Sequence, residues 1–153
     1  MPKDWLERYE HDRSEAFRRN LTAVAGVTEA VRAISAEGVA VCVASQGKLE
    51  KTRLSLELTG LGGLFADDAL FSAHSVERGK PAPDLFLHAA ASMNVQPAYC
   101  TVIEDTPSGV QAAVAAEMCV LGYAADSDEG ALRDAGAQTF ASMSELPRLV
   151  GLG

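Results

Sequence analysis

The sequence has no long apolar run and no excess of basic residues, two features that mark several classes of protein. No segment of its 153 residues reaches the ~18 consecutive apolar residues of a membrane-spanning helix, and the charged N-terminus is unlike a secretion signal. There are 13 Lys and Arg against 21 Asp and Glu, which gives a net charge of −8. This charge argues against non-specific binding to nucleic acids or anionic membranes. We therefore expect a cytoplasmic protein with neither of these partners.

Cysteine is scarce as well. Cys42, Cys100 and Cys119 contain no C-x-x-C pair that would support a zinc site. Each lies in or beside an apolar run, so we expect buried free thiols in a reducing compartment. The sequence also has no G-x-S-x-G nucleophile elbow, which argues against a serine hydrolase of that type.

What the sequence does have is the composition of one globular domain, with 48% hydrophobic and 22% charged residues. Short apolar runs alternate with helical patterns, which predicts an α/β fold with a parallel sheet and helices on both of its faces. The predicted strands are residues 39–44, 69–73, 99–103, 119–123 and 138–140. The predicted helices are residues 27–37, 48–58, 84–93, 106–118, 128–135 and 144–150, and Asp84 is expected to cap the third of them. A further amphipathic helix is expected over residues 4–21, in a packing or dimer-contact role.

Two adjacent carboxylates, Glu104 and Asp105, follow the strand predicted at residues 99–103. Ligands of open α/β sheets bind in the crevice beyond the carboxyl ends of the strands. Adjacent carboxylates repel each other there unless a cation or buried protons relieve them, and Mg2+ takes oxygen ligands, often one or two carboxylates with waters and a substrate phosphate. The pair therefore predicts a metal and phosphate site. The alternative is that the two charges only complement the dipole of the next helix.

Two more segments point to the same edge of the predicted sheet. Ser45-Gln46-Gly47 follows the strand at residues 39–44 and offers a hydroxyl and flexible backbone N–H groups that suit a phosphate, although a serine before a helix is usually only a cap. Lys80 lies in a stiff loop between Gly79 and Pro81. A lysine there would neutralise the oxygens of a transferring phosphoryl group, whereas an isolated loop lysine is most often solvated surface.

The order and spacing of these segments resemble the second, third and fourth motifs of the haloacid dehalogenase-like superfamily, over residues 24–123. The segments are Ser45, then Gly79-Lys80-Pro81-Ala82-Pro83-Asp84, then Val102-Ile103-Glu104-Asp105-Thr106-Pro107-Ser108-Gly109. Within the superfamily, the chain is similar to sugar-phosphate phosphatases and β-phosphoglucomutase-like members. The resemblance implies a Rossmann-like core, a phosphorylated small-molecule substrate and Mg2+ as cofactor.

The resemblance also implies roles for five residues. Ser45 would hydrogen-bond the transferring phosphoryl group, with the backbone N–H of Gln46 nearby. Lys80 would bridge that phosphate and the carboxylate of the nucleophile, while Glu104 and Asp105 would hold Mg2+ directly or through water. In the superfamily one Asp attacks phosphorus and a second, two residues later, acts as general acid and base. Lys80 and Asp105 are the predicted catalytic residues.

The first motif of the superfamily, an apolar strand that ends in Asp-x-Asp-Gly-Thr, is missing from this sequence. Asp126-Ser127-Asp128 has an Asp-x-Asp pattern, but it comes late and lacks the Gly-Thr, so we interpret it as a coincidence. By comparison with the superfamily, residues 1–21 look like a remnant of the cap domain and residues 22–153 like a truncated core domain. The missing strand would be central, between those predicted at residues 39–44 and 99–103.

Without that strand, two apolar strands each lack a neighbour. Buried backbone groups left unpaired cost roughly 1–3 kcal/mol each, so the two strands must close against each other, borrow a strand or dimerise through their edges. We predict a homodimer or a strand-swapped oligomer.

The leading hypothesis is a Mg2+-dependent phosphomonoester hydrolase of reduced form, in which a substitute nucleophile or a metal-activated water attacks phosphorus. Asp105, Glu104 and Asp84 are the carboxylates to examine first, and His74 is the histidine whose loop approaches the site. Two alternatives stay open. One is a catalytically inactive, truncated member that binds phosphate and metal or acts by association. The other is one half of a split enzyme, completed by a chain that carries the Asp-x-Asp segment.

Overall fold

The computed structural model describes residues 23–152 as alternating strands and helices. Its strands are β1 (Val43–Ser45), β2 (Leu70–Ser72), β3 (Thr101–Glu104), β4 (Cys119–Tyr123) and β5 (Gln138–Phe140). Its α-helices are α2 (Val27–Ala36), α3 (Leu49–Leu58), α4 (Asp84–Ser92), α5 (Pro107–Ala115), α6 (Glu129–Ala135) and α7 (Leu146–Leu149). Its 3-10 helices are η1 (Gly62–Leu64), η2 (Asp67–Ala69), η3 (Ala73–Ser75), η4 (Pro97–Tyr99) and η5 (Met143–Glu145). None of these helices is long and apolar enough to cross a membrane.

The predicted α/β class is confirmed, and every strand and helix predicted after residue 22 has a counterpart in the structure. The helix predicted over residues 4–21 lies outside the described residues. The division into a cap remnant and a core domain therefore stays a prediction.

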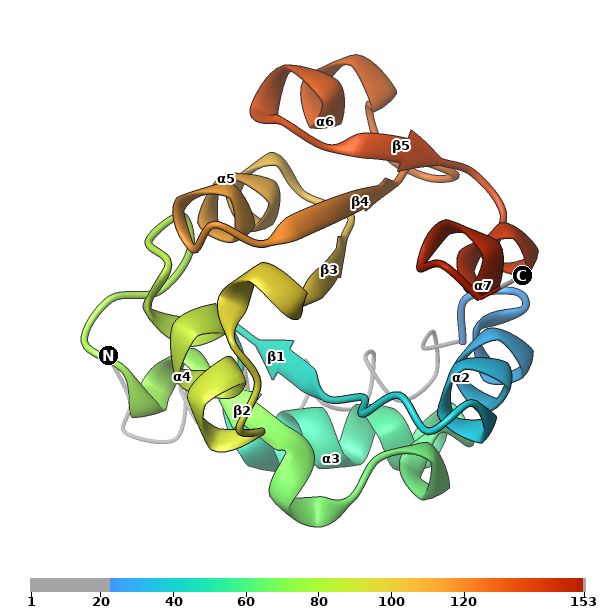
Figure 1. The fold of residues 1–153 in the computed structure, drawn as a ribbon. Coiled ribbons are helices and arrows are strands. Elements are labelled where there is room, and N and C mark those ends of the chain that lie inside the picture. Colours follow the sequence, from blue (N-terminus) through green and yellow to red (C-terminus); the bar gives the residue numbers. More distant parts are fainter. Residues whose placement is uncertain (1–22, 153) are drawn as a thin grey trace, which may run out of the picture.

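The strands form two parallel sheets, one of β1 and β2 and one in the order β3-β4-β5. Figure 1 shows the two-stranded sheet in the lower part of the molecule and the three-stranded sheet in the upper part. Within residues 23–152, β1 pairs only with β2, and β3 pairs only with β4. The two strands expected to lack a neighbour thus each keep an open edge, and they do not pair with each other.

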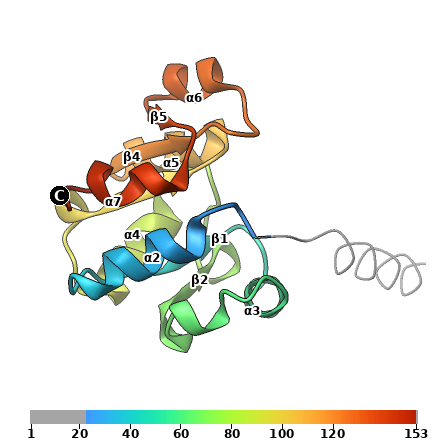
Figure 2. The ribbon, with the colours of Figure 1, turned by 90° about the vertical axis from the view of Figure 1, so that its right-hand side faces the viewer.

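Helices cover both faces of the three-stranded sheet. Alternate residues of a strand point to opposite faces, and β4 illustrates this. Val120 packs with residues of α4, α5 and α6, whereas Leu121 packs with residues of α2 and α7. Figure 2 shows α2 and α7 lying together on one side of the molecule. The predicted arrangement of helices on both faces therefore holds for this sheet.

Helix α4 joins the two sheets. Its Phe86 and Ala90 belong to the apolar cluster that includes β3 and β4, while Leu85 and Ala89 belong to the cluster that includes β2. Ala44 of β1 packs against both clusters. Because burial of apolar surface is the main favourable term in folding, α4 keeps β1 and β3 in one body although no backbone ladder connects them.

Two details of the prediction are wrong. The strand predicted at residues 39–44 forms only over Val43–Ser45, because β2 offers three residues for pairing and no other described strand flanks the run.

The cysteines are not buried as expected, since Cys42 and Cys119 are exposed and Cys100 is partly buried. Cys42 and Cys100 precede β1 and β3, whose open edges are covered by no strand within residues 23–152.

Candidate functional site

The carboxyl ends of β1 and β3 meet around one lysine side chain. Lys80 lies in the loop between η3 and α4 and donates from Nζ to the carbonyl oxygen of Ala44 in β1, at 3.4 Å. The same ammonium forms an ion pair with Oε1 of Glu104, the last residue of β3. The three segments placed at one sheet edge by the sequence therefore do lie together.

The Lys80–Glu104 pair is buried, with 9% of each side chain exposed. The ring centroid of Phe86 lies 5.1 Å from the ammonium, within the range of a cation–π attraction. An ammonium has three N–H donors, and Ala44 and Glu104 take two of them. Within residues 23–152 the third N–H has no acceptor, so the cation retains one hydrogen bond for an anion.

The start of α5 holds the second oxygen of Glu104. Oε2 accepts the backbone N–H of Asp105 at 3.3 Å and the hydroxyl of Thr106 at 3.4 Å. Thr106 also caps α5, because its Oγ1 accepts the N–H of Gly109 at 3.2 Å. Gly109 provides the room for this arrangement, since a Cβ at that position would overlap the Glu104 carboxyl group. Both oxygens of Glu104 are therefore engaged, Oε1 by Lys80 and Oε2 at the start of α5, where the helix dipole favours a negative charge.

Asp105, in contrast, is exposed, and its carboxylate has no hydrogen bond or ion pair within residues 23–152. No group of three or more His, Cys, Asp or Glu side chains in that range would hold a metal ion by itself. Two carboxylates are still compatible with Mg2+, because this ion is often held by one or two carboxylates together with waters and phosphate oxygens. Asp105 is the member of the pair that is free to bind a cation directly.

Ser45 closes β1, and Ser72 supports its loop from the neighbouring strand. Oγ of Ser45 accepts the N–H of Gly47 at 3.1 Å. The carbonyl of Gly47 in turn accepts the hydroxyl of Ser72, at 2.7 Å, and only 2% of Ser72 is exposed. Ser72 was not among the predicted site residues, although a polar residue at the end of the apolar run of β2 was a usable signal. Ser45 also lines a cavity of about 250 Å³ beside α3, with Thr52 and Ser55 in its wall.

Gln46 contacts the lysine loop through its side chain. Its Oε1 accepts the backbone N–H of Lys80 at 3.0 Å. A Cβ on Gly79 would lie 3.0 Å from this oxygen and 3.1 Å from Nε2, so the amide group of Gln46 packs closely on the glycine. Only the backbone N–H of Gln46 was predicted to take part in the site. The side-chain contact, which joins two loops 34 residues apart, was not predicted.

Arg78 fastens the lysine loop to the start of α4. Its guanidinium donates to the two carboxylate oxygens of Asp84 at 2.8 and 3.3 Å, and its backbone N–H donates to the same group at 3.2 Å. These hydrogen bonds hold the pKa of Asp84 below its usual value. The prediction of Asp84 as the helix cap is wrong, because Pro83 occupies the N-cap position and Asp84 is the first helical residue.

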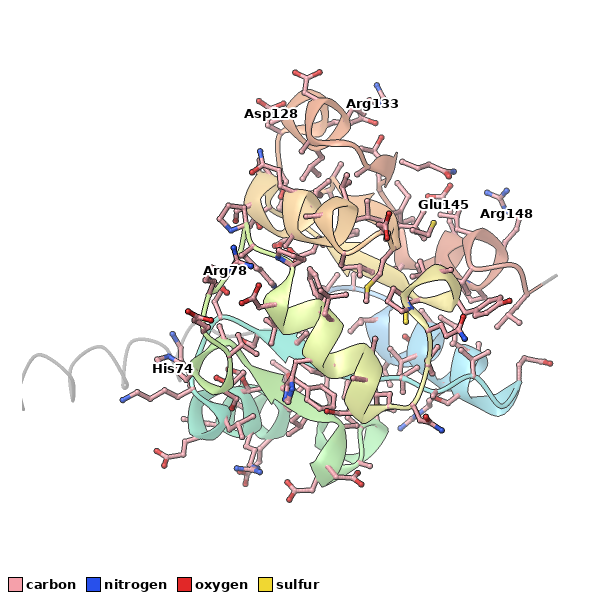
Figure 3. The ribbon with its side chains drawn as sticks, turned by 60° about the vertical axis from the view of Figure 1, so that its left-hand side comes forward. His74, Arg78, Asp128, Arg133, Glu145 and Arg148 are labelled. Carbon is pink, nitrogen blue, oxygen red and sulfur yellow. The ribbon has the colours of Figure 1, made fainter. Side chains whose placement is uncertain are left out.

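Figure 3 shows Arg78 and His74 on one flank of the molecule and Asp128 at another end, where α6 begins. His74 donates its backbone N–H to Ser72 at 3.1 Å, and the residue is exposed. Asp128 caps α6, since its Oδ1 accepts the N–H of Ala131 at 3.1 Å. This structural role agrees with the interpretation of the Asp126-Ser127-Asp128 pattern as a coincidence.

Comparison with known proteins gives consistent matches. Residues 3–117 match the family model of haloacid dehalogenase-like hydrolases. The sequence is 32% identical to 6-phosphogluconate phosphatase of Escherichia coli, over 92% of this chain and 62% of that protein. It is 41% identical to the chloroplastic protein SUPPRESSOR OF QUENCHING 1 of Arabidopsis thaliana, over 72% of this chain and 10% of that protein. The chain thus spans less than two thirds of the length of both relatives.

One solved structure resembles the fold over almost the whole chain. It is a HAD family hydrolase from Deinococcus radiodurans with bound phosphate and sodium, and it matches with a TM-score of 0.86 and 32% sequence identity. The match covers 99% of this chain and 69% of that one.

Proposed function

The chain belongs to the haloacid dehalogenase-like hydrolase family, and we propose that it is a cytoplasmic phosphatase of reduced form that acts on phosphorylated small molecules. The observation that carries the proposal is the buried ammonium of Lys80, which lies at the ends of β1 and β3 with one N–H unused. The similarity to 6-phosphogluconate phosphatase supports a substrate of the sugar-phosphate class. The phosphate in the similar hydrolase structure supports an anion site in this fold.

Lys80 and Ser45 would bind the phosphoryl oxygens. A cation that is 9% exposed attracts an anion more strongly than a surface lysine does, because little water screens it. The Ser45 hydroxyl accepts the Gly47 N–H and has its own hydrogen left to donate. Together the two side chains would orient the ester and stabilise the charge that develops on the transferring oxygens.

Glu104 and Asp105 would hold Mg2+. Bound there, the ion would polarise a phosphoryl oxygen. Because Lys80 already neutralises Glu104, Asp105 would be the direct ligand and Glu104 would contact the ion through water.

The hydrogen bonds of the candidate carboxylates bear on the proposal of a substitute nucleophile. Of the three carboxylates named from the sequence, Asp84 is bound through both oxygens to Arg78. Glu104 is bound through Oε1 to Lys80 and through Oε2 at the start of α5. Asp105 alone has an unoccupied carboxylate. In the proposed mechanism the attacking group would be Asp105, a water molecule, or a residue outside the described part of the chain.

Asp105→Asn is expected to lower Mg2+-dependent hydrolysis of a generic aryl phosphate by about 100-fold, because the loss of a ligand charge weakens metal binding at least as much as the loss of an outer-shell contact does. The rate should be measured on purified protein across a Mg2+ titration. Asp134→Asn, at an exposed position of α6, is the matched control and should behave like the wild type. An unchanged Mg2+ dependence in Asp105→Asn would remove the assigned metal role.

A second candidate is a non-catalytic protein that binds phosphate and metal. The pairing of Glu104 with Lys80 favours it, because each group neutralises the other in a site without a third metal-binding side chain among residues 23–152. Thermal stabilisation by Mg2+ and phosphate without any release of phosphate from esters would support this candidate. Restoration of turnover by a co-purified chain would point instead to a split enzyme.

We also propose that the chain associates with a second copy. The open edges of β1 and β3 leave backbone groups without ladder partners within residues 23–152, and such edges tend to pair between chains. Ile103 of β3, an apolar side chain, is 36% exposed.

Light scattering is expected to give the mass of a dimer at micromolar concentration. Ile103→Lys should shift the protein to a monomer, because a charge on an edge strand opposes pairing. Leu87→Lys, at a similarly exposed apolar position of α4 (39%), should not. A wild-type protein that stays monomeric throughout that concentration range would contradict the proposal.

A further inference from the structure

The end of β1 holds Lys80 at two points. The carbonyl of Ala44 accepts from the ammonium at 3.4 Å, and Oε1 of Gln46, two residues later, accepts from the main-chain N–H of the same lysine at 3.0 Å. One contact fixes the far end of the side chain, and the other fixes the backbone from which it starts. We infer that Gln46 is a positioning residue for Lys80.

The local sequence explains why a side chain is needed for this contact. Lys80 is followed by Pro81, which has no N–H, and the loop forms only one backbone hydrogen bond of its own near this point, from Ala82 N–H to the carbonyl of Gly79 at 3.0 Å. No backbone acceptor in residues 23–152 takes the Lys80 N–H. The amide of Gln46 supplies that acceptor, and Gly79 lets it approach, because a Cβ there would lie 3.0 Å from the same oxygen.

The remaining anchors of the lysine loop lie elsewhere. Arg78 and Asp84 tie the loop to α4, and Phe86 lies against the ammonium. Within residues 23–152, no hydrogen bond joins these three residues to the end of β1, where Ala44 packs only by apolar contact against the cluster that contains Phe86. Gln46 is thus the side chain that fixes the lysine loop relative to the Ser45 loop, so that both phosphate-binding groups keep one spacing.

This inference rests on the proposed function in one respect: the position of Lys80 affects phosphate binding only if Lys80 binds the phosphate. Gln46 carries no charge, and the residue is exposed. Its truncation should therefore leave folding intact and act through the mobility of Lys80. We expect Gln46→Ala to weaken orthophosphate binding by about five- to tenfold, the equivalent of one neutral hydrogen bond.

Hydrogen exchange of the Lys80 amide, followed by NMR, tests the contact without any need for phosphate. We expect the amide of Gln46→Ala to exchange at least about five times faster than that of the wild type, as the loss of one hydrogen bond predicts. Gln46→Glu keeps a side chain of the same length with an acceptor oxygen at its end, so its Lys80 amide should exchange as slowly as that of the wild type. Gln138→Ala, an exposed change on β5, is the matched control. Equal exchange rates in the wild type and Gln46→Ala would overturn the inference.

Orthophosphate titration of the wild type, Gln46→Ala and Gln138→Ala tests the consequence. A wild type that binds phosphate together with a Gln46→Ala variant within twofold of it would overturn the positioning role. A wild type that binds no phosphate would count against the proposed function alone, because the exchange measurement still decides whether Gln46 fixes Lys80.

Discussion

Replacement of Lys80 with methionine is expected to lower the free energy of unfolding by about 3–5 kcal/mol, the cost of removing one partner from a buried ion pair. The change leaves Glu104, whose side chain is 9% exposed, as a charge with no cation beside it. Typical domains are stable by about 5–15 kcal/mol, so the variant would lose a large share of its stability. Urea unfolding in phosphate-free buffer measures this loss. Orthophosphate binding, measured by calorimetry in mild conditions, should disappear as well.

A double variant separates the two effects. Lys80→Met combined with Glu104→Leu removes the unpaired charge and should recover most of the lost stability, because apolar groups of similar volume often replace a buried pair without cost. Phosphate binding should stay absent in the double variant. Lys48→Met, at an exposed position before α3, is the control and should change stability by less than about 0.5 kcal/mol. A Lys80→Met variant as stable as this control would mean that the ion pair is not buried.

The identity of each strand and helix followed from local sequence, whereas the length of a strand depended on its partners. Thr106 and Asp128 lie at the predicted starts of two helices, and each caps its helix with a side-chain oxygen. The apolar run at residues 39–44 looked like a longer strand than the three residues that pair. Extended backbone becomes a strand only where a neighbour offers hydrogen bonds, and no pattern within the run reports that.

The topology predicted which segments lie together in the site, but it did not predict which of their side chains form pairs. Parallel strands bring their carboxyl ends to one edge, which placed Ser45, Lys80 and Glu104 together. The resemblance to the family pointed Lys80 toward the carboxylate of a nucleophile, yet within residues 23–152 Lys80 pairs with Glu104. A buried ammonium is costly without an anion, and Glu104 is the carboxylate that lies within reach.

The hydrogen-bond partner of Asp84 is a second side-chain pairing that the sequence did not predict. Its place before an apolar helix predicted a cap, but Arg78, six residues earlier, takes both carboxylate oxygens. A capping bond is neutral at the donor, whereas the bond to a guanidinium is charge-assisted and about twice as strong. The spacing of six residues across a loop gives no periodic signal, so the stronger partner was found only from the folded chain.

Gly109→Ala is expected to destabilise the protein by about 1–3 kcal/mol, the usual cost of forcing extra volume into a packed site. The sign of this change in stability is informative, because alanine in a helix interior is otherwise more favourable than glycine by about 0.8–1.0 kcal/mol. Gly109 is the third residue of α5, and a Cβ there would overlap the carboxyl group of Glu104. Glu104 would have to leave Lys80 or push α5 away, so phosphate binding should weaken together with stability. Urea unfolding and orthophosphate titration of the same samples measure both.

Shortening Glu104 should rescue this variant. Glu104→Asp in the Gly109→Ala background withdraws the carboxylate by one methylene, which relieves the overlap while a negative charge stays near Lys80. Gly63→Ala provides the matched glycine control, because a Cβ at that position meets no atom within 4 Å, and it should be neutral or slightly stabilising through its effect on the unfolded chain. If Gly109→Ala were as stable as Gly63→Ala, the Glu104 carboxylate would not lie against α5. Its engagement by Lys80, which leaves Asp105 as the free carboxylate of the pair, would then lose its structural basis.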